Sequence, residues 1–169
     1  MGGKGKGIAV FPVTERGLEL AERLSGRPGV VVHAPMKLRR GGLKRLVGKA
    51  FEERAALLFI SASGIAVRSV APYIKGKGTD PAVIVMDEGA RFVVSLLSGH
   101  LGGANRLARE IAAFFKATPV ITTATDVAGL PCVEEIAERF SLVVEDARRI
   151  KRVNAAVLRG EKVLVVDAD

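Results

Sequence analysis

The stretch 7-GIAVFPVTERGLELAERLSG-26 carries the pattern that decides the fold class of this protein. An apolar run from Ile8 to Val13 predicts a buried strand, and Thr14 follows at a position suited to a helix N-cap. The next residues repeat apolar side chains at helical spacing, place acids in the early turns and reach Gly26, a residue typical of helix ends. A strand followed at once by an amphipathic helix is the building unit of α/β proteins.

The same alternation continues along the chain. Short apolar runs predict further strands at 30–33, 56–61, 82–87, 91–97, 118–123, 142–145 and 162–167, and helical periodicity predicts helices at 43–53, 65–73, 133–140 and 147–158 and one after Asn105. The connection 88-EGA-90 is short and contains glycine, so it suits a hairpin. We therefore predict an α/β three-layer sandwich with a mostly parallel sheet that allows one antiparallel hairpin. Residues 1–145 would form the main domain, and 146–169 would pack on it or continue it.

Composition and charge narrow the class of protein. The chain has 169 residues, of which 49% are hydrophobic, so it can bury a core, and its formal net charge is +8. The densest basic segment, 37-KLRRGGLKRLVGK-49, is expected to be the solvated face of a helix. Attraction of an anionic ligand and contact with nucleic acid are the alternatives, but no interleaved aromatic residues support nucleic-acid binding.

Targeting and cysteine chemistry are also constrained. No apolar run approaches the length of a membrane span, and the start MGGKGKG lacks the form of a signal peptide, so we expect a cytoplasmic protein. The single cysteine, Cys132, cannot form an intrachain disulfide and has no neighbours at zinc-ligand spacing. We expect it to be a small buried hydrophobic residue and expect no metal site.

Three polar junctions follow predicted strands: 61-SASG-64, 98-SGHLGGAN-105 and 122-TTATDVAG-129. Ligands of α/β sheets lie beyond the carboxyl ends of the strands, so three such loops could converge on one crevice. The candidate ligand-binding residues are Ser61, Ser63, Gly64, Ser98, Gly99, Gly102, Gly103, Asn105, Thr122, Thr123 and Thr125. The alternative is that the hydroxyls only cap helices and the glycines only allow tight turns.

Two side chains could carry chemistry. His100 could act as a general base or hydrogen-bond a ligand, and Asp126 could orient an imidazole or accept a proton; each could instead be a local cap. We expect His33 to be structural, and likewise the turn formers Asp80, Asp87 and Glu88. The junctions match neither the phosphate-binding loop nor the nucleophile elbow, so nucleotide binding and a serine triad are disfavoured.

The blocks TDPAV at 79–83, SLLSGHLGGAN at 95–105 and PVITTATD at 119–126 stand in one order within a longer stretch, 64–131. This stretch closely resembles the N-terminal domain of the CbiG family of cobalamin-biosynthesis proteins, the cobalt-precorrin-5A hydrolases. The flanking sequence is compatible with the N-terminal and middle regions of that family.

The resemblance implies a step of anaerobic vitamin B12 synthesis, within porphyrin and corrinoid metabolism. The ring A δ-lactone of cobalt-precorrin-5A would be opened and acetaldehyde released, giving cobalt-precorrin-5B. Water activated by His100 or Asp126 would attack the lactone carbonyl, and amides of the glycine loop or near Gly64 would stabilise the oxyanion. Cobalt would arrive within the substrate, so no cofactor is expected.

Members of the family usually continue into a further C-terminal domain. The runner-up interpretation is therefore a non-catalytic corrinoid-binding module or subunit that needs a separate polypeptide carrying that domain. Self-association and the identity of the base are left open by the sequence.

Overall fold

The computed structural model of the chain describes residues 5–34, 42–140, 142–144 and 146–164. These residues form two compact units, Met1–Val120 and Ile121–Asp169, and each is treated by itself. The units divide at Val120, whereas the sequence suggests a boundary at residue 145. A domain boundary at residue 145 stays a prediction. Within the described residues, no helix combines the length and apolarity that crossing a membrane requires.

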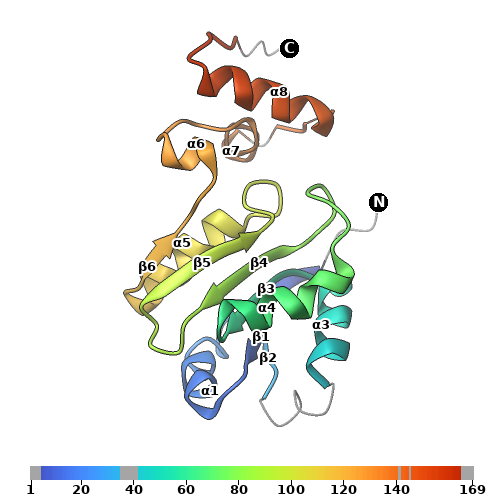
Figure 1. Cartoon of the computed structure of the whole chain (residues 1–169), viewed down its shortest axis with the longest axis vertical. Helices are drawn as coiled ribbons and strands as arrows, with labels where there is room; N and C mark the ends of the chain where they lie inside the picture. Colours follow the sequence, from blue (N-terminus) through green and yellow to red (C-terminus); the bar gives the residue numbers. More distant parts are fainter. Residues whose placement is uncertain (1–4, 35–41, 141, 145, 165–169) are drawn as a thin grey trace. The chain divides into compact units, whose positions relative to one another are not determined.

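The first unit is built on a six-stranded sheet with the order β2-β1-β3-β4-β5-β6 (Figure 1). Its strands are β1 (Gly5–Pro12), β2 (Val30–Val32), β3 (Arg54–Ile60), β4 (Ala82–Met86), β5 (Phe92–Leu97) and β6 (Thr118–Val120). All neighbouring strands are parallel except β4 and β5, which pair antiparallel. The predicted mostly parallel sheet with one antiparallel hairpin is therefore confirmed.

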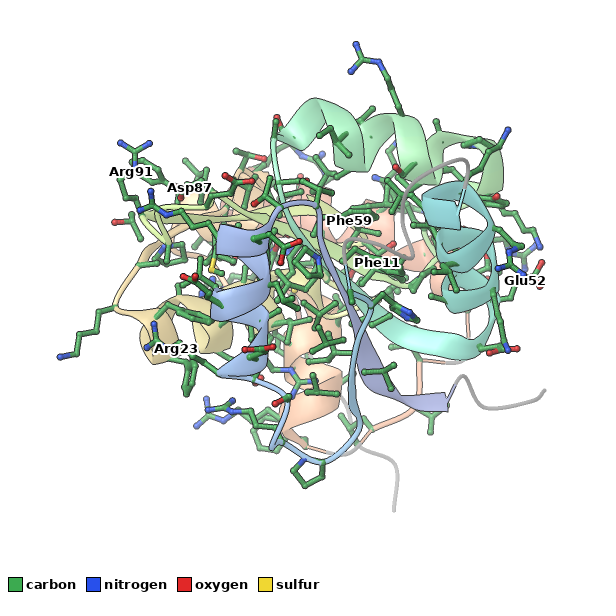
Figure 2. All side chains as sticks on the ribbon, turned by 90° about the horizontal axis from the view of Figure 1, so that it is seen from below. Phe11, Arg23, Glu52, Phe59, Asp87 and Arg91 are labelled. Atoms are coloured by element: carbon green, nitrogen blue, oxygen red, sulfur yellow. The ribbon has the colours of Figure 1, made fainter. Side chains whose placement is uncertain are left out.

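Helices cover both faces of the sheet, as the predicted three layers require. Helices α1 (Glu15–Glu22) and α5 (Ala104–Phe115) pack on one face, and α3 (Gly42–Glu53) and α4 (Ser63–Val70) pack on the other. Successive strand residues alternate between the two cores: Val10 faces α1 and α5, whereas Phe11 faces α3 and α4. The Phe11 and Phe59 rings stack with their centroids 5.2 Å apart. Figure 2 shows both rings in the interior and Glu52 on the outside of α3.

The first strand is followed by a capped helix, as the sequence predicts. Thr14 is the N-cap of α1, and its hydroxyl accepts a hydrogen bond from the Gly17 amide at 3.1 Å. The same hydroxyl donates to Glu88 of the β4–β5 turn at 2.7 Å. One threonine thus begins the helix and also ties it to a turn far away in the sequence.

The β4–β5 turn is organised by Asp87, as expected of a turn former. Its carboxylate accepts hydrogen bonds from the amides of Gly89, Arg91 and Phe92, and the Arg91 guanidinium lies 3.2 Å away. Figure 2 shows the two side chains together at the rim of the unit. Partial burial opposes ionisation of Asp87, but these hydrogen bonds outweigh it and lower its pKa.

The second unit contains the helices α6 (Ala124–Val127), α7 (Val133–Arg139) and α8 (Ala147–Leu158). Asn154 of α8 joins two of them, because its side chain accepts from the Val133 amide at 2.9 Å and donates to Glu134 at 2.8 Å. Asp146 is the N-cap of α8 and accepts from the Arg148 amide. Both helices predicted near 133–140 and 147–158 are confirmed.

Two of the predicted strands do not form in the described part of this unit. Residues 142–144 and 162–164 are irregular, although their apolar runs predict strands at 142–145 and 162–167. Residues 145 and 165–167 of these two runs lie outside the described residues. A strand needs a neighbour for its backbone hydrogen bonds, and an apolar run alone does not supply one. The structure also contains a helix that was not predicted, α6, which is too short to show helical periodicity in the sequence.

Candidate functional site

The direction of β5 decides where the candidate loops lie. Because β5 is antiparallel to β4, its last residue, Leu97, lies opposite Val83 near the start of β4 (Figure 1). β6 is parallel to β5 and therefore ends at the same side of the sheet. We call residues 98–103 the glycine loop and this side of the first unit the glycine-loop end of the sheet.

The prediction that the junctions at 61–64 and 98–105 converge is wrong. Ile60, the last residue of β3, pairs with Met86 at the end of β4, whereas the glycine loop lies at the start of β4. Ser61, Ser63 and Gly64 therefore stand at the opposite end of the sheet from the glycine loop. The error arises because the rule of converging strand ends holds for parallel strands, and the hairpin reverses β5.

The 61–64 junction is held together locally. Ser61 is buried, its amide donates to the Met86 carbonyl and its hydroxyl donates to the Ala62 carbonyl at 3.1 Å. The N-cap of α4 is Ala62, whose methyl side chain cannot accept a hydrogen bond. The alternative in which Ser61 or Ser63 is the N-cap is therefore wrong, and the Gly64 carbonyl accepts from Arg68 at 3.2 Å.

The glycine loop folds back on the first turn of α5. The Gly103 amide donates to the His100 carbonyl at 2.8 Å, the Ala104 amide to the Ser98 carbonyl at 3.1 Å, and the Asn105 amide to the Gly99 carbonyl at 2.9 Å. The N-cap of α5 is Gly103, with φ +80°, a conformation that glycine adopts without strain. Ser98 caps through its carbonyl rather than through its hydroxyl.

Close contacts explain two more glycines of this loop. A Cβ at Gly102 would lie 2.4 Å from the Ser98 Cβ and 3.3 Å from the Ala82 amide nitrogen. A Cβ at Gly99 would lie 2.8 Å from the Asn105 side-chain oxygen, which also accepts from the Ser95 hydroxyl at 2.7 Å. The loop therefore packs against both β4 and α5 with no room for side chains at these positions.

Ser98 itself has an unusual conformation. Its φ is +59°, in the left-handed region that a residue with a side chain rarely adopts. Its hydroxyl oxygen is buried, and none of the described residues hydrogen-bonds to it. Strained residues of this kind occur disproportionately at ligand-binding sites. His100, two residues further on, is half-buried within the same loop.

The residues 79–83 adjoin the glycine loop. Asp80 is buried, and its carboxylate accepts from the amides of Lys75 and Gly76, each at 3.0 Å. This loop closure positions the chain immediately before β4, whose first residue, Ala82, touches Gly102. Asp80 is thus structural, as expected. It supports the same end of the sheet to which the glycine loop belongs.

The third junction, 122–129, belongs to the second unit. Thr123 is the N-cap of α6, and its hydroxyl donates to Asp126 at 2.5 Å. Thr125 is buried, Thr122 is exposed and Asp126 is half-buried. Thr123 makes no side-chain cap hydrogen bond to α6, and its contact with Asp126 instead fixes the direction of the Asp126 carboxylate.

Other expected structural residues are confirmed. The His33 ring stacks on Phe11 with centroids 4.8 Å apart. Cys132 is buried, and burial raises the pKa of its thiol to about 12, so it is a poor nucleophile at neutral pH.

In the basic segment, residues 37–41 lie outside the described residues, whereas Lys44, Arg45 and Lys49 lie on exposed parts of α3.

A groove of about 210 Å³ lies at the glycine-loop end of the first unit. Much of its lining has little or no side chain: Gly7, Ala56 and Ala82 near the starts of three strands, and Gly102 and Gly103 of the loop. Its charged residues are Arg106 and Glu110 of α5, whose side chains form an ion pair at 3.5 Å. Neither residue is among the sequence-predicted site residues, although opposite charges four residues apart in a helix that follows a glycine loop indicate such a pair.

The family model described as Cobalamin synthesis G N-terminal matches residues 45–126. The match includes β3, β4, β5 and the glycine loop, so the matched residues contain the reversal of the sheet. The resemblance to this family is confirmed.

Relatives extend the CbiG similarity over most of the chain. A cobalt-precorrin-5A hydrolase of Salmonella typhimurium is 40% identical over 95% of this chain and 48% of the relative, and one of Priestia megaterium is 38% identical over 94% and 46%. A solved cobalamin biosynthesis protein G homolog from Sulfolobus solfataricus matches with a TM-score of 0.57 and 28% identity, over 96% of this chain and 50% of that one. The chain spans about half the length of the curated CbiG relatives that it matches.

Proposed function

We propose that this chain carries the N-terminal part of a cobalt-precorrin-5A hydrolase. The observation that carries the proposal is the 40% identity to the Salmonella hydrolase over 95% of this chain. The gathering of 79–83 and the glycine loop at one end of the sheet supports it, because both belong to the blocks that carry the resemblance. The substrate would be cobalt-precorrin-5A, and cobalt would enter as part of it, with no cofactor supplied by the protein.

The reaction has two steps. Water adds to the carbonyl of the ring A δ-lactone, the bond to the ring oxygen breaks, and the proton lost by water passes to the released alkoxide. The new hydroxyl then loses its proton, the carbon–carbon bond to the macrocycle breaks, and acetaldehyde leaves. The electron pair of that bond passes into the conjugated macrocycle, which yields cobalt-precorrin-5B after protonation.

Two groups compete for the role of general base. His100 stands in the glycine loop, where a neutral imidazole could take a proton from water. Asp126 is the alternative, with its carboxylate oriented by Thr123. The oxyanion would be stabilised by other amides of the glycine loop, since those of Gly103, Ala104 and Asn105 already donate to carbonyls of that loop.

A second candidate function rests on the share of the relatives that the chain covers, about half. If the other half completes the active site, this chain would be a corrinoid-binding subunit that needs a separate C-terminal polypeptide. Binding of substrate by this chain without turnover is the property that distinguishes this candidate from the first.

Purified chain mixed with cobalt-precorrin-5A under anaerobic conditions tests both candidates. Acetaldehyde, followed by the oxidation of NADH with alcohol dehydrogenase, supports the hydrolase. A change in the corrin absorption spectrum without acetaldehyde supports the binding subunit, and the C-terminal half of the Salmonella relative should then restore release. If the C-terminal half is present and neither acetaldehyde nor a spectral change is observed, both candidates are contradicted.

The base is assigned by two variants. His100→Ala should lower acetaldehyde release by about a hundredfold or more if the imidazole takes the proton. Asp126→Asn should lower acetaldehyde release by a similar factor if the Asp126 carboxylate takes the proton. Melting curves of both variants serve as the control for folding, and turnover of His100→Ala at the wild-type rate would remove His100 from the chemistry.

A further inference from the structure

The groove at the glycine-loop end differs in size and lining from a complete ligand pocket. Its volume of about 210 Å³ lies below the roughly 300–1,000 Å³ typical of pockets that enclose a drug-sized ligand. Ile8 and Leu107 give it apolar walls, and its glycines and alanines leave the backbone accessible. Such a groove suits one edge of a larger, flat molecule rather than the whole of it.

Arg106 is the cation at this groove. Its Nη2 atom lies 3.9 Å from the position that a Gly103 Cβ would take, so the guanidinium extends over the end of the glycine loop. Its Nη1 atom lies 3.5 Å from the Glu110 carboxylate. The side chains are 64% and 54% exposed, and an ion pair so accessible to water contributes little stability. A carboxylate of a ligand can therefore compete with Glu110 for the same guanidinium.

We infer that this groove is a subsite for one carboxylate-bearing ring of an anionic tetrapyrrole, and that Arg106 binds the carboxylate. The inference rests on the proposed function and assigns part of its substrate recognition to a named residue. A planar guanidinium can bind a carboxylate through two parallel hydrogen bonds, which fixes orientation as well as position. The bound ring would then lie beside the loop that contains His100.

Replacing Glu110 tests whether Arg106 binds the ligand, because it should change binding in a way that a purely structural role of Arg106 would not. The carboxylate of Glu110 competes with the ligand and repels it, so its removal should tighten binding while removal of Arg106 weakens it. Arg109 on the same helix is exposed and does not line the groove, so Arg109→Gln is a matched change of charge.

The test titrates each variant with cobyrinic acid, a cobalt corrin whose side chains are free carboxylates, and with its methyl ester. For cobyrinic acid, Arg106→Gln should raise the Kd about three- to tenfold and Glu110→Gln should lower it about twofold. Arg109→Gln should match the wild-type protein, and Arg106→Lys should restore part of the affinity. For the methyl ester, Arg106→Gln and the wild-type protein should bind alike.

The outcomes separate this inference from the proposed function. If the wild-type protein binds cobyrinic acid or releases acetaldehyde, but Arg106→Gln behaves as Arg109→Gln does, the subsite is overturned and the hydrolase proposal stands. If the wild-type protein, supplied with the C-terminal half of the Salmonella relative, neither binds the corrin nor releases acetaldehyde, both fail. Equal weakening by Arg106→Gln for acid and ester would also overturn a role in carboxylate binding.

Discussion

Gly102 lies so close to Ser98 and to the start of β4 that the glycine loop admits no side chain there. This contact, rather than any demand for a left-handed backbone, makes the residue a glycine, because only Gly103 of the neighbouring pair has a positive φ. The sequence correctly predicted a turn and a helix start here. It could not predict which glycines make room for a neighbour and which supply a backbone conformation, since both look the same in a sequence.

Gly102→Ala should destabilise the first unit by about 2 kcal/mol or more, because its Cβ would overlap the Ser98 Cβ and press on the Ser98 carbonyl. Urea denaturation followed by circular dichroism measures the free energy of unfolding. Gly26→Ala is the matched control, since nothing lies within 4 Å of a Cβ at Gly26. Equal stability of the two variants would show that the loop moves to accept the methyl group.

The β4–β5 hairpin was predicted correctly from the sequence, but its effect on the positions of the loops was not. The glycine-containing connection at 88–90 predicted the antiparallel pair, which the antiparallel pairing of Val85 with Val94 confirms. Because β5 is reversed, its last residue lies at the opposite end of the sheet from the last residue of β3. The predicted convergence of the loops did not take this reversal into account. Strand direction follows from topology, so it had to be inferred from the hairpin and could not be read from local periodicity.

The start of α1 should depend on one hydroxyl. Thr14→Ala removes both the cap on the Gly17 amide and the hydrogen bond to Glu88, and we expect a loss of about 1 kcal/mol in the free energy of unfolding. Thr14→Ser keeps a hydroxyl and should retain most of the stability. Chemical denaturation of the three proteins gives the comparison, and a Thr14→Ala protein as stable as the Thr14→Ser protein would contradict the capping role.

The Asp87 turn should make stability depend on pH in acid. The pKa of Asp87 is lowered in the folded state, so its contribution is present above the unfolded pKa of about 3.9 and is lost as pH falls through the folded pKa. Asp87→Asn should therefore lose less stability than the wild-type protein between about pH 4 and pH 2. The measurement is the free energy of unfolding at each pH.

Glu52→Gln is the control for that titration. Glu52 is exposed on α3, away from the hairpin (Figure 2), and its replacement should leave the acid dependence of the wild-type protein unchanged. If Asp87→Asn and Glu52→Gln give the same slope as the wild-type protein, the turn does not contribute to acid sensitivity.

The first unit contains the six-stranded sheet, the helices on both of its faces and the glycine loop. The α/β class and the order of most elements follow from the sequence because strands and helices alternate with distinct periods. The extent of the sheet does not follow, because the apolar runs near 142 and 162 resemble strands yet have no strand partner among the described residues. Strand formation depends on neighbours that local sequence does not specify.

Residues 1–120 should therefore fold without the second unit. We expect this fragment to unfold cooperatively with the circular dichroism of an α/β protein, because its two cores draw only on residues before Val120. Thermal denaturation and dispersed amide signals in an NMR spectrum provide the measurement. A fragment that is soluble but lacks a cooperative transition would show that the second unit is needed to complete the fold.

The hydrogen bonds of Gly103, Ala104 and Asn105 to carbonyls of their own loop have a consequence for how a ligand meets this protein. These amides should exchange with deuterium slowly even in the free protein, because they are bonded before any ligand arrives. The entropy of ordering the loop is lost when the chain folds, so association does not incur that cost again. A ligand of the glycine loop would bind a loop whose conformation was already formed during folding.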